Sequence, residues 1–174
     1  MMQKGDLKQV SGLKACFGLI ITQFGLFVLT SYFFGITHPL IPYFPNTPLG
    51  FVGYLLACIF MVAPLYLFFG YLYILSRNRR YYLFADLLKG SIIFAILMVI
   101  LFLFCLLLAV TRVYPKAWTF YILTNYPMGI AMTFYEDPTA WRNLFFLPTT
   151  VFPSLFFFLG GWLRIRNMKK EGLK

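Results

Sequence analysis

Four long apolar runs that hold almost no formal charge constrain this chain more than any other feature of its sequence. They extend over about 15–36, 49–75, 87–110 and 144–163. About 20 apolar residues cross the hydrocarbon core of a membrane as an α-helix, which rises about 1.5 Å per residue. Because lipid offers no hydrogen-bond partner to the backbone, each run is predicted to be a helix. Pro148 and Pro153 are predicted to kink the fourth one.

The composition excludes most other classes of protein. Hydrophobic residues make up 61% of the 174 residues, and charged residues only 11%, whereas a soluble domain carries about 25% charged residues. A soluble enzyme, a disordered chain and a fibrous chain are therefore excluded. We predict an all-α integral membrane protein with a single transmembrane domain over 1–174, built as a four-transmembrane-helix bundle.

The distribution of positive charge predicts how the chain is oriented. All but three of the 15 Lys and Arg residues fall near the N-terminus, between the second and third runs, or in the C-terminal tail. The exceptions are Arg112, Lys116 and Arg142. By the positive-inside rule, both termini are expected to be cytoplasmic. Basic residues at helix ends indicate topology rather than nucleic-acid binding, and the short loops favour a bacterial plasma or inner membrane.

The outer loop between the third and fourth runs contains a further uncharged segment, 118–135. It is close to the length of a membrane span, but Pro127 and Gly129 interrupt its centre, and such a pair breaks a helix. A full crossing would also place the basic C-terminal tail outside. We therefore predict an interfacial or re-entrant helical segment, with Asn125, Pro127 and Gly129 at the tip if it is re-entrant.

Few residues have side chains that could take part in catalysis or in binding a ligand. Gln23 is the only strongly polar side chain deep in a run, and its amide is expected to bond across a helix interface or, less favourably, to contact a ligand. Glu136 and Asp137 form an outer acidic pair that fits a helix start, although with His38 they could serve a lipid-modifying enzyme. No spacing of metal ligands or nucleophile motif accompanies them, so we expect no catalytic, metal or cofactor site.

A group of arginines is expected on the inner face. This inner basic collar consists of Arg77, Arg79, Arg80, Arg164 and Arg166. Basic side chains near an anionic leaflet each gain about 1 kcal/mol, so the collar is expected to attract anionic headgroups. Docking of an acidic cytoplasmic partner is the alternative.

We expect a non-enzymatic membrane protein that binds a partner in the membrane, as an accessory subunit, an assembly factor or an immunity or inhibitor protein. The partner would be another membrane protein or a second copy of the chain. The alternative is a small oligomeric channel or transporter that uses 118–135 as its re-entrant element.

Overall fold

A computed structural model describes residues 13–34, 48–75, 83–114, 116–125 and 141–170, and all regular structure in these ranges is helical. The elements are α1 (Leu13–Phe34), α2 (Pro48–Leu75), α3 (Leu83–Val110), α4 (Ala117–Thr124), the 3₁₀ helix η3 (Trp141–Thr150) and α6 (Phe152–Lys170). The all-α expectation therefore holds for the described part of the chain.

Three stretches are long and apolar enough to cross a membrane: Leu55–Ile74 in α2, Phe84–Val110 in α3, and Asn143–Met168, which joins η3 to α6. They fall on the second, third and fourth apolar runs of the sequence. The described apolar stretch of α1, Leu13–Leu29, is shorter. The helix itself continues to Phe34 and has 22 residues.

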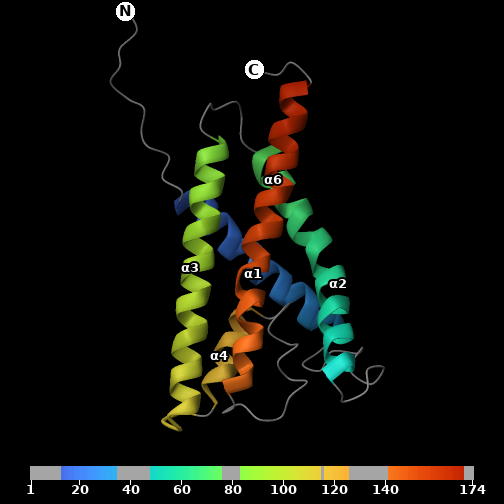
Figure 1. Ribbon diagram of the computed structural model, residues 1–174. Helices are drawn as coiled ribbons and strands as arrows, with labels where there is room; N and C mark the ends of the chain where they lie inside the picture. Colours follow the sequence, from blue (N-terminus) through green and yellow to red (C-terminus); the bar gives the residue numbers. More distant parts are fainter. Residues whose placement is uncertain (1–12, 35–47, 76–82, 115, 126–140, 171–174) are drawn as a thin grey trace, which may run out of the picture.

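The long helices form two packed pairs (Figure 1). α2 packs mainly against α6, and α1 packs mainly against α3, while α6 also contacts α3. In the view of Figure 1, α1 crosses obliquely from the α3 side of the molecule to the α2 side. The beginnings of α1 and α3 and the ends of α2 and α6 point toward the upper end, and α4 lies at the lower end.

Two glycines allow α2 and α6 to approach each other closely. A Cβ added at Gly70 would collide with the backbone carbonyl oxygen of Phe157, and one added at Gly160 would collide with the carbonyl oxygen of Leu67. The crossing is thus made backbone to backbone, as small residues permit in membrane helices. Gly161 brings α6 against α3 in a similar way, because a Cβ there would lie 2.6 Å from Leu87 Cδ2.

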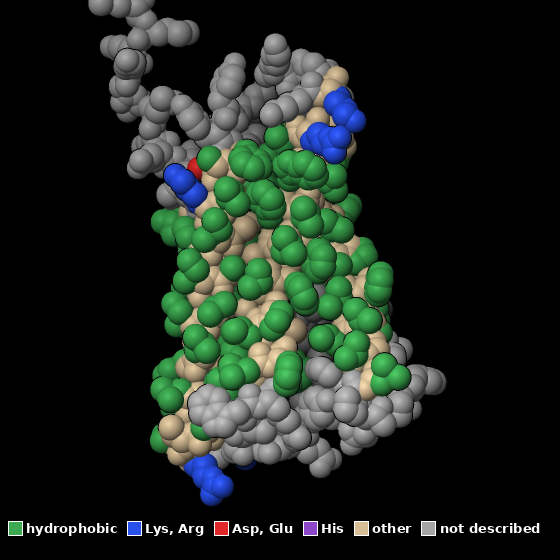
Figure 2. Space-filling view, viewed as in Figure 1, with side chains coloured by type: hydrophobic (Ala, Val, Ile, Leu, Met, Phe, Trp, Pro, Cys, Tyr) green, Lys and Arg blue, Asp and Glu red, His purple; other side chains and the backbone are tan. Residues whose placement is uncertain are grey.

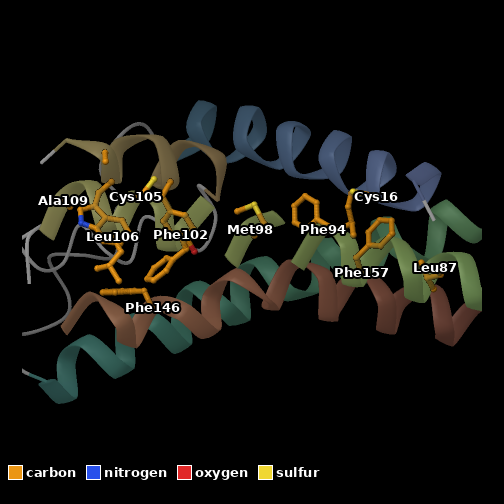
Figure 3. Close-up of a cluster of buried hydrophobic side chains, with 14 of the residues drawn as sticks. Cys16, Leu87, Phe94, Met98, Phe102, Cys105, Leu106, Ala109, Phe146 and Phe157 are labelled. Carbon is orange, nitrogen blue, oxygen red and sulfur yellow. The ribbon is translucent and has the colours of Figure 1, made fainter. Parts of the chain in front are cut away.

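The larger of two clusters of buried apolar side chains in the described residues is centred on one face of α3, and a smaller one is formed by Leu26, Val62 and Tyr66. Phe94, Met98, Phe102 and Cys105 lie along this face. Cys16 of α1 and Phe157 of α6 pack onto the part of the cluster near Phe94, and Phe146 of η3 packs near Phe102 (Figure 3).

The fourth apolar run is a 3₁₀ helix followed by an α-helix, rather than one kinked α-helix. Pro148 lies inside η3 and has no N–H to continue an α-helical ladder. Thr149 and Thr150 instead donate side-chain hydrogen bonds to the carbonyl oxygens three residues before them, at 2.6 and 2.7 Å. Pro153 falls in the first turn of α6, where a missing N–H costs nothing. Because a 3₁₀ helix rises about 2 Å per residue, η3 lengthens this segment.

On the face shown in Figure 2, the described surface between the two ends is almost entirely apolar. Large exposed hydrophobic side chains occur on all the long helices, and the Lys and Arg side chains lie toward the two ends. Soluble monomers rarely expose a contiguous apolar patch larger than a few hundred Å², whereas here large apolar side chains are exposed along all the long helices. The described residues therefore have the exterior of a membrane protein.

Candidate functional site

Five buried polar side chains from four different elements meet in the interior. We call them the polar cluster: Gln23 of α1, Tyr66 of α2, Tyr121 of α4, Asn125 at the C-terminal cap of α4, and Thr149 of η3. Gln23 is 6% exposed, and the other four are 0 or 1% exposed. Burying this many polar groups among apolar side chains is costly unless each finds a partner.

Gln23 is the hub that connects three of the elements. Its side-chain oxygen Oε1 accepts a hydrogen bond from the hydroxyl of Tyr66. Its Nε2 donates to the backbone oxygen of Thr124 at 2.9 Å and to Oδ1 of Asn125 at 3.3 Å. The amide of Gln23 therefore ties α1 to α2 on one side and to the end of α4 on the other.

Asn125 continues the chain of hydrogen bonds toward η3. Its Nδ2 donates to the hydroxyl of Tyr121 at 2.8 Å and to the backbone oxygen of Thr149 at 3.4 Å. The hydroxyls of Tyr121 and Thr149 are 3.1 Å apart. Since the Thr149 hydroxyl donates to the Phe146 carbonyl oxygen, the Tyr121 hydroxyl must be the donor of this pair.

The donors and acceptors of the cluster form one consistent series. It runs from Tyr66 through Gln23, Asn125 and Tyr121 to Thr149, and it ends on a backbone carbonyl. Both N–H groups of each amide are engaged. The cluster contains no carboxylate, imidazole or amine, so it offers no general acid or base suited to neutral pH.

Apolar packing positions α4, which supplies two members of the cluster. After α3 the chain reverses at Arg112, which has a positive φ of 58°. α4 then runs back along α3, and Phe102 of α3 packs against the rings of Trp118 and Tyr121, with centroid separations of 5.2 and 5.0 Å. These contacts direct the end of α4 toward Gln23.

Two of the residues singled out in the sequence, Gln23 and Asn125, are thus brought into direct contact. Tyr66, Tyr121 and Thr149 were missed. A tyrosine inside an apolar run was the available signal for Tyr66, because a buried phenol usually needs a hydrogen-bond partner. Tyr66 lies 43 residues from Gln23 in the sequence, and Asn125 lies 102 residues from it. No local sequence pattern connects residues that are so far apart.

Two arginines of the inner basic collar, Arg164 and Arg166, lie in the described part of the chain, and they face different surroundings. Arg164 turns toward α2, where its Nη1 donates to the hydroxyl of Tyr71 at 3.4 Å and its guanidinium lies 5.5 Å from the centre of that ring. Arg166 is exposed, and its guanidinium lies 5.6 Å from the centre of the Trp162 ring in the same helix.

The other candidate residues fall outside the described ranges. They are Arg77, Arg79 and Arg80 of the collar, Pro127 and Gly129 of the predicted tip, the acidic pair Glu136 and Asp137, and His38. Segment 118–135 is described only as far as Asn125.

The described residues include no group of three or more His, Cys, Asp or Glu side chains that could hold a metal ion. Comparisons with models of protein families, with curated proteins and with solved structures found no match to this chain.

Proposed function

We propose that this protein crosses the membrane four times, with α1, α2, α3 and the joined η3 and α6 as its spans and both termini in the cytoplasm. The distribution of charge supports this orientation. Lys14 and Lys89 lie near the beginnings of α1 and α3, and Arg164, Arg166 and Lys170 lie near the end of α6. These ends point the same way in Figure 1. Arg112 and Lys116 adjoin the opposite ends of α3 and α4.

In this arrangement α4 is a re-entrant helix. It has only eight residues, about 12 Å of helix, which is too short to span. Its inner face is buried at Trp118 and Tyr121. Its backbone end reaches Gln23, which lies in the middle of α1, rather than resting on the surface of the bundle.

The function supported best is that of a non-enzymatic membrane protein that acts by binding a partner within the membrane. One observation carries this proposal: the polar groups that meet inside the bundle bond to one another. The hydrogen-bonding groups of the polar cluster are thereby devoted to holding α1, α2, α4 and η3 together. The broad apolar exterior remains as the surface on which a partner can act, as an accessory subunit, assembly factor or inhibitor would require.

The test is purification of the tagged full-length chain in mild detergent from cells that express it at its native level, followed by quantitative mass spectrometry. A different membrane protein recovered at a fixed stoichiometry is the expected result. A second copy of the chain as the sole companion would restrict the proposal to a homo-oligomer. Recovery of a monomer, repeated after cross-linking in intact membranes, would refute it.

A small oligomeric channel or transporter is the second candidate, because α4 turns back along α3 as re-entrant elements of channels do. In that case Asn125 would line the path of a permeating solute. Its side chain is fully buried and bonded to Gln23, Tyr121 and Thr149. The geometry thus supports a fastening role for Asn125 better than a role in permeation.

A further inference from the structure

The end of α6 carries a stripe of three side chains that face away from the bundle. Trp162, Arg166 and Lys170 are spaced four residues apart, so they follow one another along one side of the helix. Trp162 is half-buried, whereas Arg166 and Lys170 are exposed. The opposite side of the helix holds Gly160 and Gly161, which pack against α2 and α3.

The stripe extends from the apolar zone to the charged end of the molecule. Leu155 and Leu163 mark the exposed apolar part of α6, and the basic side chains of its last turns belong to the charged upper end in Figure 2. Trp162 and Lys170 are separated by about 12 Å of helix at 1.5 Å per residue. An indole at this depth lies where Trp concentrates in membrane proteins, at the level of the headgroups.

Arg166 is held in place within the stripe. Its guanidinium lies 5.6 Å from the centre of the Trp162 ring, a cation–π contact that limits its freedom while leaving its N–H groups available. Arg164, two residues earlier, points toward α2 and bonds to Tyr71. The two arginines therefore have different surroundings, and only Arg166 faces the lipid side of α6.

We propose that Trp162, Arg166 and Lys170 form a binding site for the phosphate of an anionic phospholipid in the inner leaflet. The planar guanidinium of Arg166 bonds to two phosphate oxygens, Lys170 adds a second positive charge one turn farther out, and the Trp162 ring packs against the glycerol and upper acyl chain. The inference rests on the proposed placement of the helices in a membrane, and it names a lipid partner for the outer side of α6.

Quenching of Trp162 fluorescence by brominated lipids tests this site. The full-length protein is placed in phosphatidylcholine vesicles that contain an increasing fraction of brominated phosphatidylglycerol or, in a parallel series, brominated phosphatidylcholine. The same titration on Trp162→Phe gives the contribution of Trp118 and Trp141, which is subtracted. We expect the anionic lipid to be preferred by about fivefold for each basic residue, or about 25-fold for the pair.

Two matched double variants show which basic residues cause the preference for the anionic lipid. Arg166→Gln combined with Lys170→Gln should bring the ratio of the two quenching constants close to 1. Arg112→Gln combined with Lys116→Gln removes the same charge from the opposite end and should leave the ratio unchanged. Soluble glycerol phosphate, added as a competitor, should not relieve the quenching.

Three results would overturn the proposal. Equal quenching by both lipids would show that the stripe contacts lipid without selecting a charge. Retained preference in the Arg166 and Lys170 double variant would place the site elsewhere, and full relief by glycerol phosphate would indicate a site for a soluble anion. Absence of quenching by either lipid would instead contradict the membrane placement itself, so the failure of the two proposals can be told apart.

Discussion

At the scale of single residues, Gln23 makes the most connections in the polar cluster. Three groups depend on its amide: the hydroxyl of Tyr66, the backbone oxygen of Thr124 and the side-chain oxygen of Asn125. A buried polar group that loses its partner costs about 1–3 kcal/mol, which is more than the bond itself contributes. The consequences of replacing Gln23 should therefore reach beyond its own helix.

We predict that Gln23→Leu lowers the free energy of unfolding by about 1–3 kcal/mol. The shape of the side chain is nearly kept, but its three hydrogen bonds are lost. Unfolding in mixed micelles with a denaturing detergent measures the change. Phe24→Leu is the control, because Phe24 is the next residue and is 66% exposed; equal effects of the two substitutions would contradict the role of Gln23.

The sequence singles out individual residues of the polar cluster, but it does not predict which of them contact one another. An amide deep in an apolar run must find a partner, and this argument correctly expects Gln23 to bond across a helix interface. Its partners could not be predicted, because they depend on how far α4 folds back along α3. That distance is determined by the packing of Phe102 against Trp118 and Tyr121, for which the sequence has no periodic signal.

At the scale of elements, the contact between α2 and α6 depends most on glycine. Gly70 and Gly160 each approach a backbone carbonyl of the other helix, and a backbone cannot move aside as a flexible side chain can. Gly25 in α1 is different, because a Cβ added there would meet no atom within 4 Å.

We predict that Gly70→Ala destabilises the protein by at least about 1–3 kcal/mol through overpacking. Gly25→Ala should be neutral or should stabilise by up to about 1 kcal/mol, since Ala favours a helix more than Gly does. The same unfolding assay compares the two. A similar effect of both substitutions would mean that α2 and α6 do not cross at Gly70.

The sequence predicts which segments are helical more readily than it predicts the type of helix. Long apolar runs leave a helix as the only structure that satisfies its backbone in lipid, so α2 and α3 follow closely from composition. The sequence of the fourth run predicts an α-helix with kinks, and no feature of it predicts the 3₁₀ helix η3. Whether Pro148 kinks an α-helix or ends it depends on Thr149 and Thr150, whose hydroxyls bond the nearby carbonyl oxygens of Phe146 and Leu147.

At the scale of the whole molecule, the proposed orientation can be tested with single cysteines. Val113→Cys lies in the turn after α3, where Val113 is 72% exposed, and Lys170→Cys lies at the exposed end of α6. An impermeant maleimide added to intact cells should label the first variant and should label the second only after the membrane is opened. If the maleimide labels Lys170→Cys in intact cells and labels Val113→Cys only after the membrane is opened, the orientation of the protein is the opposite of the proposed one.

The native thiols serve as internal controls for this experiment. Cys16 and Cys105 are buried, so they should react with the maleimide only after unfolding. Cys58 is replaced by serine in all variants, to leave one reactive position. Reaction of Cys16 or Cys105 in the folded protein would contradict the packing of α1 and α4 against α3.

In the arrangement that we propose, Asn125 fastens α4 into the bundle and does not line a path for a solute. The unfolding free energy of Asn125→Leu tests it most directly, together with flux through proteoliposomes that hold the same variant. We predict a loss of about 1–3 kcal/mol, because Gln23 and Tyr121 lose a buried partner. Unchanged stability combined with the loss of a flux that the wild-type protein supports would contradict the claim.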